Sequence, residues 1–161
     1  QPVYAQPPAE LRSDKQPPML SQAQIVFVFS VFVIMASHIQ GAKPVLEPFQ
    51  WENRLILVRA EEAESREIMS QFAAQRAAID ERHIVWFIFA GDGIETNHKG
   101  SLPENFAGRI SEAGYWKGDE TVLLIGKDGG VKARQEALDL EELFRRIDSM
   151  PMRRAEMRAE K

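Results

Sequence analysis

The sequence predicts an α/β fold built around a mixed central sheet. Two continuous apolar runs of strand length, Leu55–Val58 and Ile84–Ala90, are typical of central strands that are covered on both faces. A stretch with helical periodicity separates them, which favours parallel pairing through a crossover helix. A glycine-rich turn at Lys127–Gly130 predicts a late hairpin, which would add an antiparallel edge to the sheet.

Two prolines predict the conformation of the segment that enters the domain, and apolar periodicity predicts its first helix. Pro44 and Pro48 are expected to keep the entry extended. The first helix is predicted over Glu61–Arg82, because its apolar side chains recur at spacings of four and seven: Ile68, Phe72 and Ile79.

The middle of the chain contains one loop, one weaker helix and the hairpin strands. The second apolar run is expected to end at Gly91–Gly93 and to be followed by a loop to about Leu102. A helix is predicted over Pro103–Ala113. Thr121–Ile125 is the third predicted strand, and Val131–Arg134 is the strand that returns from the glycine-rich turn.

The last predicted helix has a clear start and a clear end. Asp139 is expected to cap it, with Glu142 three residues on as a variant capping box. Its buried stripe comprises Leu140, Leu143, Phe144 and Ile147. Pro151 is expected to stop the helix. The resulting order, β-α-β-α-β-β-α, is the connectivity of a thioredoxin-like sandwich.

Composition excludes several classes of function. The 161 residues are enough for one ordinary domain, and they include no cysteine. The protein is therefore not a thiol–disulfide oxidoreductase, and it has no cysteine ligands for zinc. The formal net charge of −4 gives no electrostatic reason to expect nucleic acid as a partner.

The N-terminal quarter predicts export. Gln1–Pro18 is rich in proline and glutamine and is expected to be disordered, or to reflect a misplaced upstream boundary, since the chain does not begin with Met. Met19–Ala42 is predicted to be a signal peptide, because Ile25–Ala36 has the length of a signal's apolar region. The alternatives are an uncleaved membrane anchor and a buried core segment. Lys43–Lys161 would form the thioredoxin-like domain.

Three stretches of this domain resemble a known group of proteins. They are WENRLILV at Trp51–Val58, LLIGKDGGVKAR at Leu123–Arg134 and LEELFRRIDSMPMRRAEMR at Leu140–Arg158. They are similar to the thioredoxin-like domain of unknown function of short exported bacterial proteins, which also occurs in vertebrate sushi-repeat and coiled-coil-domain matrix proteins (the P-DUDES group). The resemblance covers about Phe49–Arg158. It implies the fold, export and a matrix or adhesion role, and it carries over no catalytic residue.

In a thioredoxin-like fold the working surface lies where the first strand meets its helix. The candidate binding residues at this edge are Arg59, Glu61, Ser65, Asp119 and Thr121. The cysteine pair of redox relatives is missing, and no proline precedes the third strand. Three glutamates at the helix start stabilise the positive end of the helix dipole and disfavour an anionic ligand. The alternative is an ordinary negatively charged helix start.

The hairpin is the second candidate binding surface. Lys132 and Arg134, two residues apart, are expected to point to the same face of their strand and to add to the charge of Lys127. Further positive charge lies near the C terminus: Arg145, Arg146, Arg153, Arg154 and Arg158. A polyanion or an acidic protein surface could use this charge. The alternative is that these arginines complement the helix end and pair with Glu141, Glu142 and Glu156.

A polar loop offers the alternative of an enzyme. Asp92, Glu95, Asn97 and His98 carry oxygen and imidazole groups that could hold a metal or serve a cysteine-independent hydrolase. Their spacing matches no established motif, so a solvated polar loop is the competing interpretation. The three tryptophans are expected to be core or rim aromatics: Trp51, Trp86 and Trp116.

These observations favour a non-enzymatic exported module, periplasmic or secreted, that binds another macromolecule or has a structural role. The expected partner is an envelope or extracellular protein or a polyanion, with no nucleic acid and no cofactor. A membrane would be involved only if the apolar segment Ile25–Ala36 stays attached.

Overall fold

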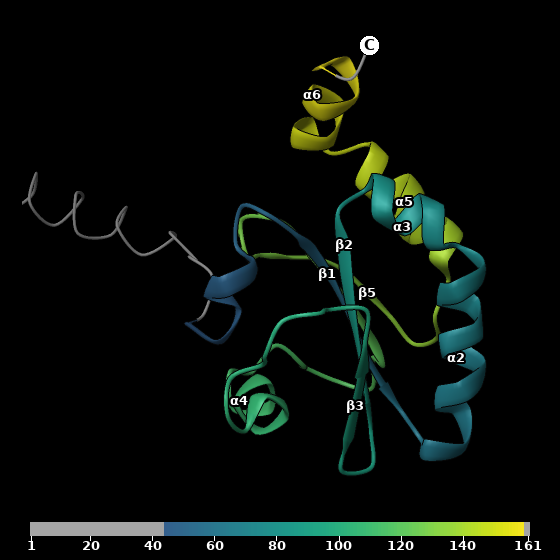
Figure 1. Ribbon diagram of the computed structural model, residues 1–161, viewed down its shortest axis with the longest axis vertical. Helices are drawn as coiled ribbons and strands as arrows, with labels where there is room; N and C mark the ends of the chain where they lie inside the picture. Colours follow the sequence, from purple (N-terminus) through teal and green to yellow (C-terminus); the bar gives the residue numbers. More distant parts are fainter. Residues whose placement is uncertain (1–43, 160–161) are drawn as a thin grey trace, which may run out of the picture. The chain divides into compact units, whose positions relative to one another are not determined.

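The computed structural model describes residues 44–159 and confirms the predicted α/β class (Figure 1). Within them, five strands form one sheet in the order β3-β2-β1-β4-β5. The strands are β1 Arg54–Ala60, β2 Ile84–Ala90, β3 Gly93–Thr96, β4 Val122–Ile125 and β5 Val131–Gln135. β1 pairs in parallel with β2, and the other pairs are antiparallel. The arrangement is consistent with a thioredoxin-like fold.

Helices cover both faces of the sheet (Figure 1). They are the 3-10 helix η2 Pro44–Phe49 and the α-helices α2 Glu62–Ala74, α3 Arg76–Glu81, α4 Phe106–Glu112, α5 Leu140–Asp148 and α6 Pro151–Ala159. α4 and η2 pack on one face, whereas α2, α3 and α5 pack on the other. No helix in this part of the chain is both long and apolar enough to cross a membrane. The segments 1–18 and 19–42 lie outside the described residues.

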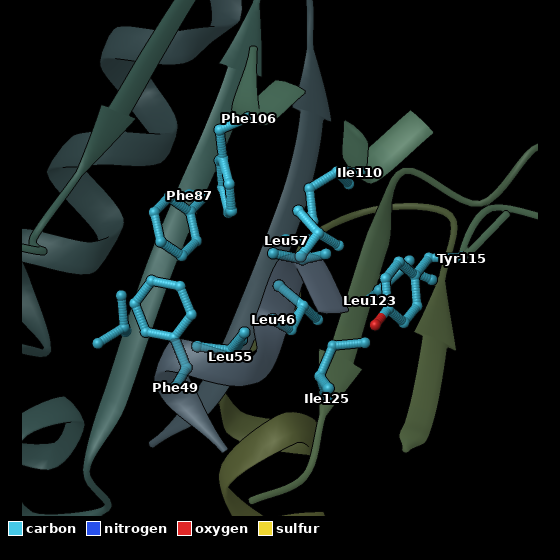
Figure 2. Close-up of a cluster of buried hydrophobic side chains, with 12 residues drawn as sticks. Leu46, Phe49, Leu55, Leu57, Phe87, Phe106, Ile110, Tyr115, Leu123 and Ile125 are labelled. Atoms are coloured by element: carbon cyan, nitrogen blue, oxygen red, sulfur yellow. The ribbon is translucent and has the colours of Figure 1, made fainter. Parts of the chain in front are cut away.

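Alternation along β1 divides the core into two clusters. Leu55 and Leu57 point to the cluster under α4, whereas Ile56 and Val58 point to the cluster under α2 and α5. Figure 2 shows the first cluster, in which the Phe49 ring meets the Phe87 ring edge-on with centroids 5.5 Å apart. Because both faces of β1 are buried over Leu55–Val58, this part of its sequence is continuously apolar rather than alternating.

The predicted loop after β2 is instead a β-hairpin. β3 pairs antiparallel with β2, and a two-residue turn at Gly91 and Asp92 joins the strands. Gly91 adopts a left-handed conformation with φ of 53°, which glycine tolerates without steric cost. This hairpin reverses the chain before α4, and β4 then runs antiparallel to β1 rather than parallel to it.

Three further local predictions were wrong. The entry containing Pro44 and Pro48 is a 3-10 helix rather than an extended segment, because the fixed φ of proline also suits helical turns. The predicted helix over Glu61–Arg82 is broken at Gln75, whose φ of −106° and ψ of 19° leave the helical region. Trp51 is 62% exposed, so it is not a core or rim side chain.

A β-bulge places Lys132 and Arg134 on different faces of β5. Leu124 pairs with Ala133 and Ile125 pairs with Val131, which leaves Lys132 as the extra residue. As a result Val131 packs on the cluster under α4, whereas Ala133 packs on the opposite cluster. The prediction that Lys132 and Arg134 point to the same face was wrong, because it assumed uninterrupted alternation.

Candidate functional site

A basic pocket lies between the β4–β5 turn and the junction of α5 with α6. Its volume is about 480 Å³, and four cationic side chains line it: Arg54, Lys127, Lys132 and Arg146. Asp128 is the only carboxylate in its lining. Met150, Pro151 and Met152 form an apolar wall. We refer to this cavity as the basic pocket.

The turn sequence Gly126–Gly130 shapes one side of the basic pocket. Gly129 has a φ of 78°, which favours glycine, and its N–H donates to the carbonyl of Gly126 (2.9 Å). The Asp128 carboxylate accepts from the Gly130 N–H (3.1 Å) and pairs with Lys132 Nζ (2.6 Å). Burial raises the pKa of Asp128, but the hydrogen bonds from Lys132 and Gly130 outweigh it, so the pKa is lowered. Asp128 therefore holds Lys132 at the pocket.

The half-buried carboxylate of Glu156 anchors the two deepest cations. Arg54 is 1% exposed, and its guanidinium donates to both carboxylate oxygens of Glu156 (3.1 and 3.2 Å). Lys127 Nζ lies 2.8 Å from Glu156 Oε1 and 3.0 Å from His83 Nδ1. Burial alone would raise the pKa of Glu156, but Lys127 and Arg54 lower it to about 2. Glu156 is therefore ionised at neutral pH.

α6 docks on this network by charge rather than by apolar burial. Its one buried residue is Arg153, which is 0% exposed and forms ion pairs with Glu81, Asp148 (3.6 Å) and Glu156 (3.7 Å). The expectation that the C-terminal arginines pair with Glu156 is confirmed for Arg153. The network therefore joins α6 to the start of β1 and to the hairpin turn.

Two strained residues contact Lys127. Trp51 and His83 adopt left-handed backbone conformations with φ of 68° and 50°, which cost on the order of 1–3 kcal/mol each for residues other than glycine. The Trp51 N–H donates to the Lys127 carbonyl (2.6 Å), and His83 contacts the Lys127 ammonium. Strain of this kind persists only where the surrounding contacts hold it. Lys127 is thus fixed at both its backbone and its side chain.

The edge predicted as the working surface brings Arg59 and Thr121 together. The Arg59 N–H donates to the Thr121 carbonyl (2.8 Å). The Arg59 guanidinium donates to the carbonyls of Gly118 (3.1 Å) and Glu120 (2.5 Å) and lies over the Trp116 ring (4.4 Å). These contacts engage Arg59 within the protein and fix the loop before β4.

Arg134 belongs to this edge rather than to the basic pocket. Its guanidinium pairs with the carboxylate of Glu120, which also accepts from the Lys117 N–H (2.7 Å). The Lys117 N–H is the main cause of the lowered pKa of Glu120, and Arg134 contributes to it. The two hairpin cations that were predicted to act together therefore serve different ends of β5.

Acidic side chains surround the remaining predicted site residues. Glu61 precedes α2 and Asp119 lies in the loop, both exposed, and Ser65 donates to the Glu62 carbonyl (2.9 Å). A cavity of about 390 Å³ is lined by Arg59 and Thr121 together with three carboxylates: Glu64, Glu67 and Glu136. This charge balance disfavours an anion, in agreement with the argument from the helix start.

Asp92 and His98 do not converge. Asp92 is exposed in the β2–β3 turn, whereas His98 lies beyond the other end of β3, roughly 20 Å along an extended chain. The His98 ring packs edge-on against Phe49 with centroids 5.1 Å apart. No group of three or more metal-ligating side chains occurs among residues 44–159. The loop therefore lacks the geometry that the enzyme hypothesis requires.

Sequence reasoning identified Lys127 and Lys132 but missed the pocket they form with Arg54 and Arg146. Two segments within the stretches that resemble the known group, KDGGVK and MPMRRAEMR, both contribute lining residues to this pocket. A family model described as "Domain of unknown function (DUF4174)" matches residues 45–156. No curated protein and no solved structure matches the chain.

Proposed function

The chain belongs to the DUF4174 family of domains of unknown function, and we propose that it is a non-enzymatic module that binds an anionic group of another molecule through the basic pocket. One observation carries this proposal: four cations and a single carboxylate line one cavity in a chain whose overall net charge is negative. The positive charge is therefore local to the pocket rather than a property of the whole surface.

The arrangement of the cations supports selective recognition. Arg54 and Lys127 are buried and held by Glu156, whereas Arg146 is exposed at the pocket and donates one hydrogen bond to the Lys132 carbonyl (3.2 Å). An incoming anion would gain charge-assisted hydrogen bonds from Arg146 and Lys132, beside two deeper cations that share the one carboxylate of Glu156. Because these side chains are already positioned, the ordering cost of binding is low.

Export is part of this proposal. It rests on the apolar run Ile25–Ala36, whose length suits a signal peptide, and on the resemblance to exported proteins. An envelope or extracellular protein or a polyanion would then be the partner. N-terminal sequencing of the protein recovered outside the cytoplasm tests it: a start near Lys43 supports a cleaved signal, and a retained apolar run contradicts it.

The binding proposal is tested with two anionic polymers, heparin and polyglutamate, and the full chain. Arg146→Glu is expected to weaken binding of at least one of them by about tenfold or more, because it reverses a charge in the pocket. Arg145→Glu is the matched control, since Arg145 is also exposed on α5 but does not line the pocket. Equal binding by both variants to both polymers would contradict the proposal.

A second pair of variants separates the pocket from the edge near Arg59. Lys132→Glu should weaken binding as Arg146→Glu does, because Lys132 lines the pocket. Arg134→Glu should leave binding within about twofold, since Arg134 does not line the pocket and its guanidinium pairs with Glu120. Loss of binding in Arg134→Glu alone would move the site to the other end of β5.

A further inference from the structure

We infer that the anionic group is a carboxylate of a protein segment, an Asp or Glu side chain with an apolar residue beside it. This inference rests on the proposed function and names its ligand class. Three observations carry it: the way two cations of the basic pocket hold Glu156, the apolar wall of the pocket, and the exposed side chains of Met152 and Trp51.

Glu156 shows how two cations of the pocket, Arg54 and Lys127, bind a carboxylate. Its two oxygens engage both terminal nitrogens of Arg54, and one of them also pairs with Lys127 Nζ. Planar guanidinium and carboxylate groups match in this bidentate geometry. Arg146 and Lys132 offer the same two kinds of donor, one guanidinium and one ammonium, on the accessible side of the pocket. A second carboxylate would thus meet one guanidinium and one ammonium, and it would share the ammonium of Lys132 with Asp128.

The pocket's depth favours an inserted side chain over a polymer lying across the surface. Arg54 and Lys127 are 1% and 8% exposed, so a long polyanion cannot reach them without inserting a single group. The cavity volume of about 480 Å³ lies within the range of pockets that enclose a small ligand. This volume is larger than a single carboxylate group fills. The space beyond the charge must therefore be filled by something else.

Apolar side chains at the pocket indicate that an apolar group of the ligand fills the remaining space. Met150, Pro151 and Met152 line the pocket, and Met152 is 42% exposed. Trp51, which is 62% exposed, is bound through its N–H to the Lys127 carbonyl. These are the two large apolar side chains that are exposed in the described part of the chain: Met152 lines the pocket, and the backbone of Trp51 is bonded to that of the pocket residue Lys127. Trp, Met and Arg are enriched at protein–protein interfaces, whereas a sulfated sugar or a nucleic acid brings no apolar side chain to meet them.

The probe is a short peptide, acetyl-Gly-Glu-Leu-Gly-amide, titrated into the full chain. Backbone amide shifts in the NMR spectrum report binding at the turn and at the start of α6. Two comparison peptides replace Glu by Gln or Leu by Gly. Each replacement is expected to weaken binding by about fivefold or more, the first by removing the charge and the second by removing the apolar contact. Heparin is titrated in parallel.

Variants connect the peptide to the pocket. Arg146→Gln should weaken binding of the Glu-Leu peptide by about fivefold or more, whereas Arg145→Gln should leave this binding unchanged. Met152→Ser should abolish the preference for Leu over Gly while leaving the preference for Glu over Gln. Both positions are on the surface, so these variants are expected to fold as the parent does.

The outcomes separate the two levels of the proposal. If heparin binds in an Arg146-dependent manner but no peptide does, the protein carboxylate is wrong and an anion-binding module remains. A Glu-Gly peptide that binds as well as the Glu-Leu peptide would also overturn the inference. If neither heparin nor any peptide distinguishes Arg146→Gln from Arg145→Gln, the proposed function itself is wrong.

Discussion

The guanidinium of Arg54 at the start of β1 donates to both carboxylate oxygens of Glu156 in α6, a residue 102 positions away in the sequence. Arg54 and Arg153 are among the largest fully buried side chains of the described residues. Glu156 is the carboxylate that contacts both of them. Removing one partner of a buried ion pair leaves the other charge buried and uncompensated, which destabilises the fold.

Replacing Glu156 with Gln should therefore lower the free energy of unfolding markedly. We expect a loss of about 3 kcal/mol, because Arg54 and Lys127 would remain buried without their carboxylate. Urea denaturation followed by circular dichroism measures the change. Glu141→Gln is the control, since Glu141 is exposed on α5, and it should stay within about 0.5 kcal/mol of the parent. If both variants lose the same amount, α6 is not held through Glu156.

The lowered pKa of Glu156 predicts a specific pH dependence. The folded-state pKa is about 2, below the ordinary value of 4.5, so the ionised carboxylate stabilises the fold at every pH above about 4.5. This stabilisation should be lost as pH falls from 4.5 towards 2. We expect it to amount to about 2 kcal/mol, less than the full shift implies, because the carboxylate is partly solvated.

The gap in unfolding free energy between the parent and Glu156→Gln measures this contribution. It should be constant from pH 7 to about 5 and narrow below that, since only the parent has a carboxylate to protonate at this position. Other carboxylates titrate equally in both proteins and cancel. A gap that does not depend on pH between 5 and 2 would show that the pKa of Glu156 is the same in the folded and the unfolded protein.

The elements that the sequence predicts well are those with a local signal. The apolar run Ile84–Ala90 is a strand with those bounds, and Asp139 caps α5 by accepting from the Glu142 N–H (2.9 Å), as predicted. The β2–β3 hairpin also had a local signal, the Gly-Asp-Gly at Gly91–Gly93. The break at Gln75 had none, because no glycine or proline marks it.

The basic pocket could not be predicted because its parts are distant in the sequence. Arg54 directly precedes an apolar run, where an arginine is usually exposed, but in the fold it is buried and pairs with Glu156 of α6. No glycine at Lys132 signals the β-bulge in the sequence. The bulge nevertheless places the side chains of Lys132 and Arg134 on different faces of β5. The sequence therefore shows where the basic residues are, but it does not predict which of them line the same pocket.

The side chain of Asn97 extends the sheet beyond the end of β3. Its amide oxygen accepts from the Trp86 N–H (2.9 Å), and its amide nitrogen donates to the Ile84 carbonyl (3.0 Å). Asn97→Ala leaves both backbone groups of β2 without these partners, which should cost about 1–2 kcal/mol. Hydrogen exchange of the Trp86 amide should accelerate more than that of Ile88, which lies within the paired part of β2. Equal acceleration of both amides would indicate global destabilisation instead.

Arg59 should fix the loop before β4 without contributing much to overall stability. Its guanidinium holds the carbonyls of Gly118 and Glu120, and the Glu120 carboxylate accepts from the Lys117 N–H. Because Arg59 is exposed, Arg59→Ala should lower the free energy of unfolding by less than about 1 kcal/mol. Exchange of the Lys117 amide should nevertheless accelerate by about fivefold or more, because the loop opens locally. Arg134→Gln removes the other cation at Glu120 but keeps the carbonyl contacts, so its effect on Lys117 should be smaller. A larger effect in Arg134→Gln would mean that the ion pair, rather than the contacts from Arg59, holds the loop.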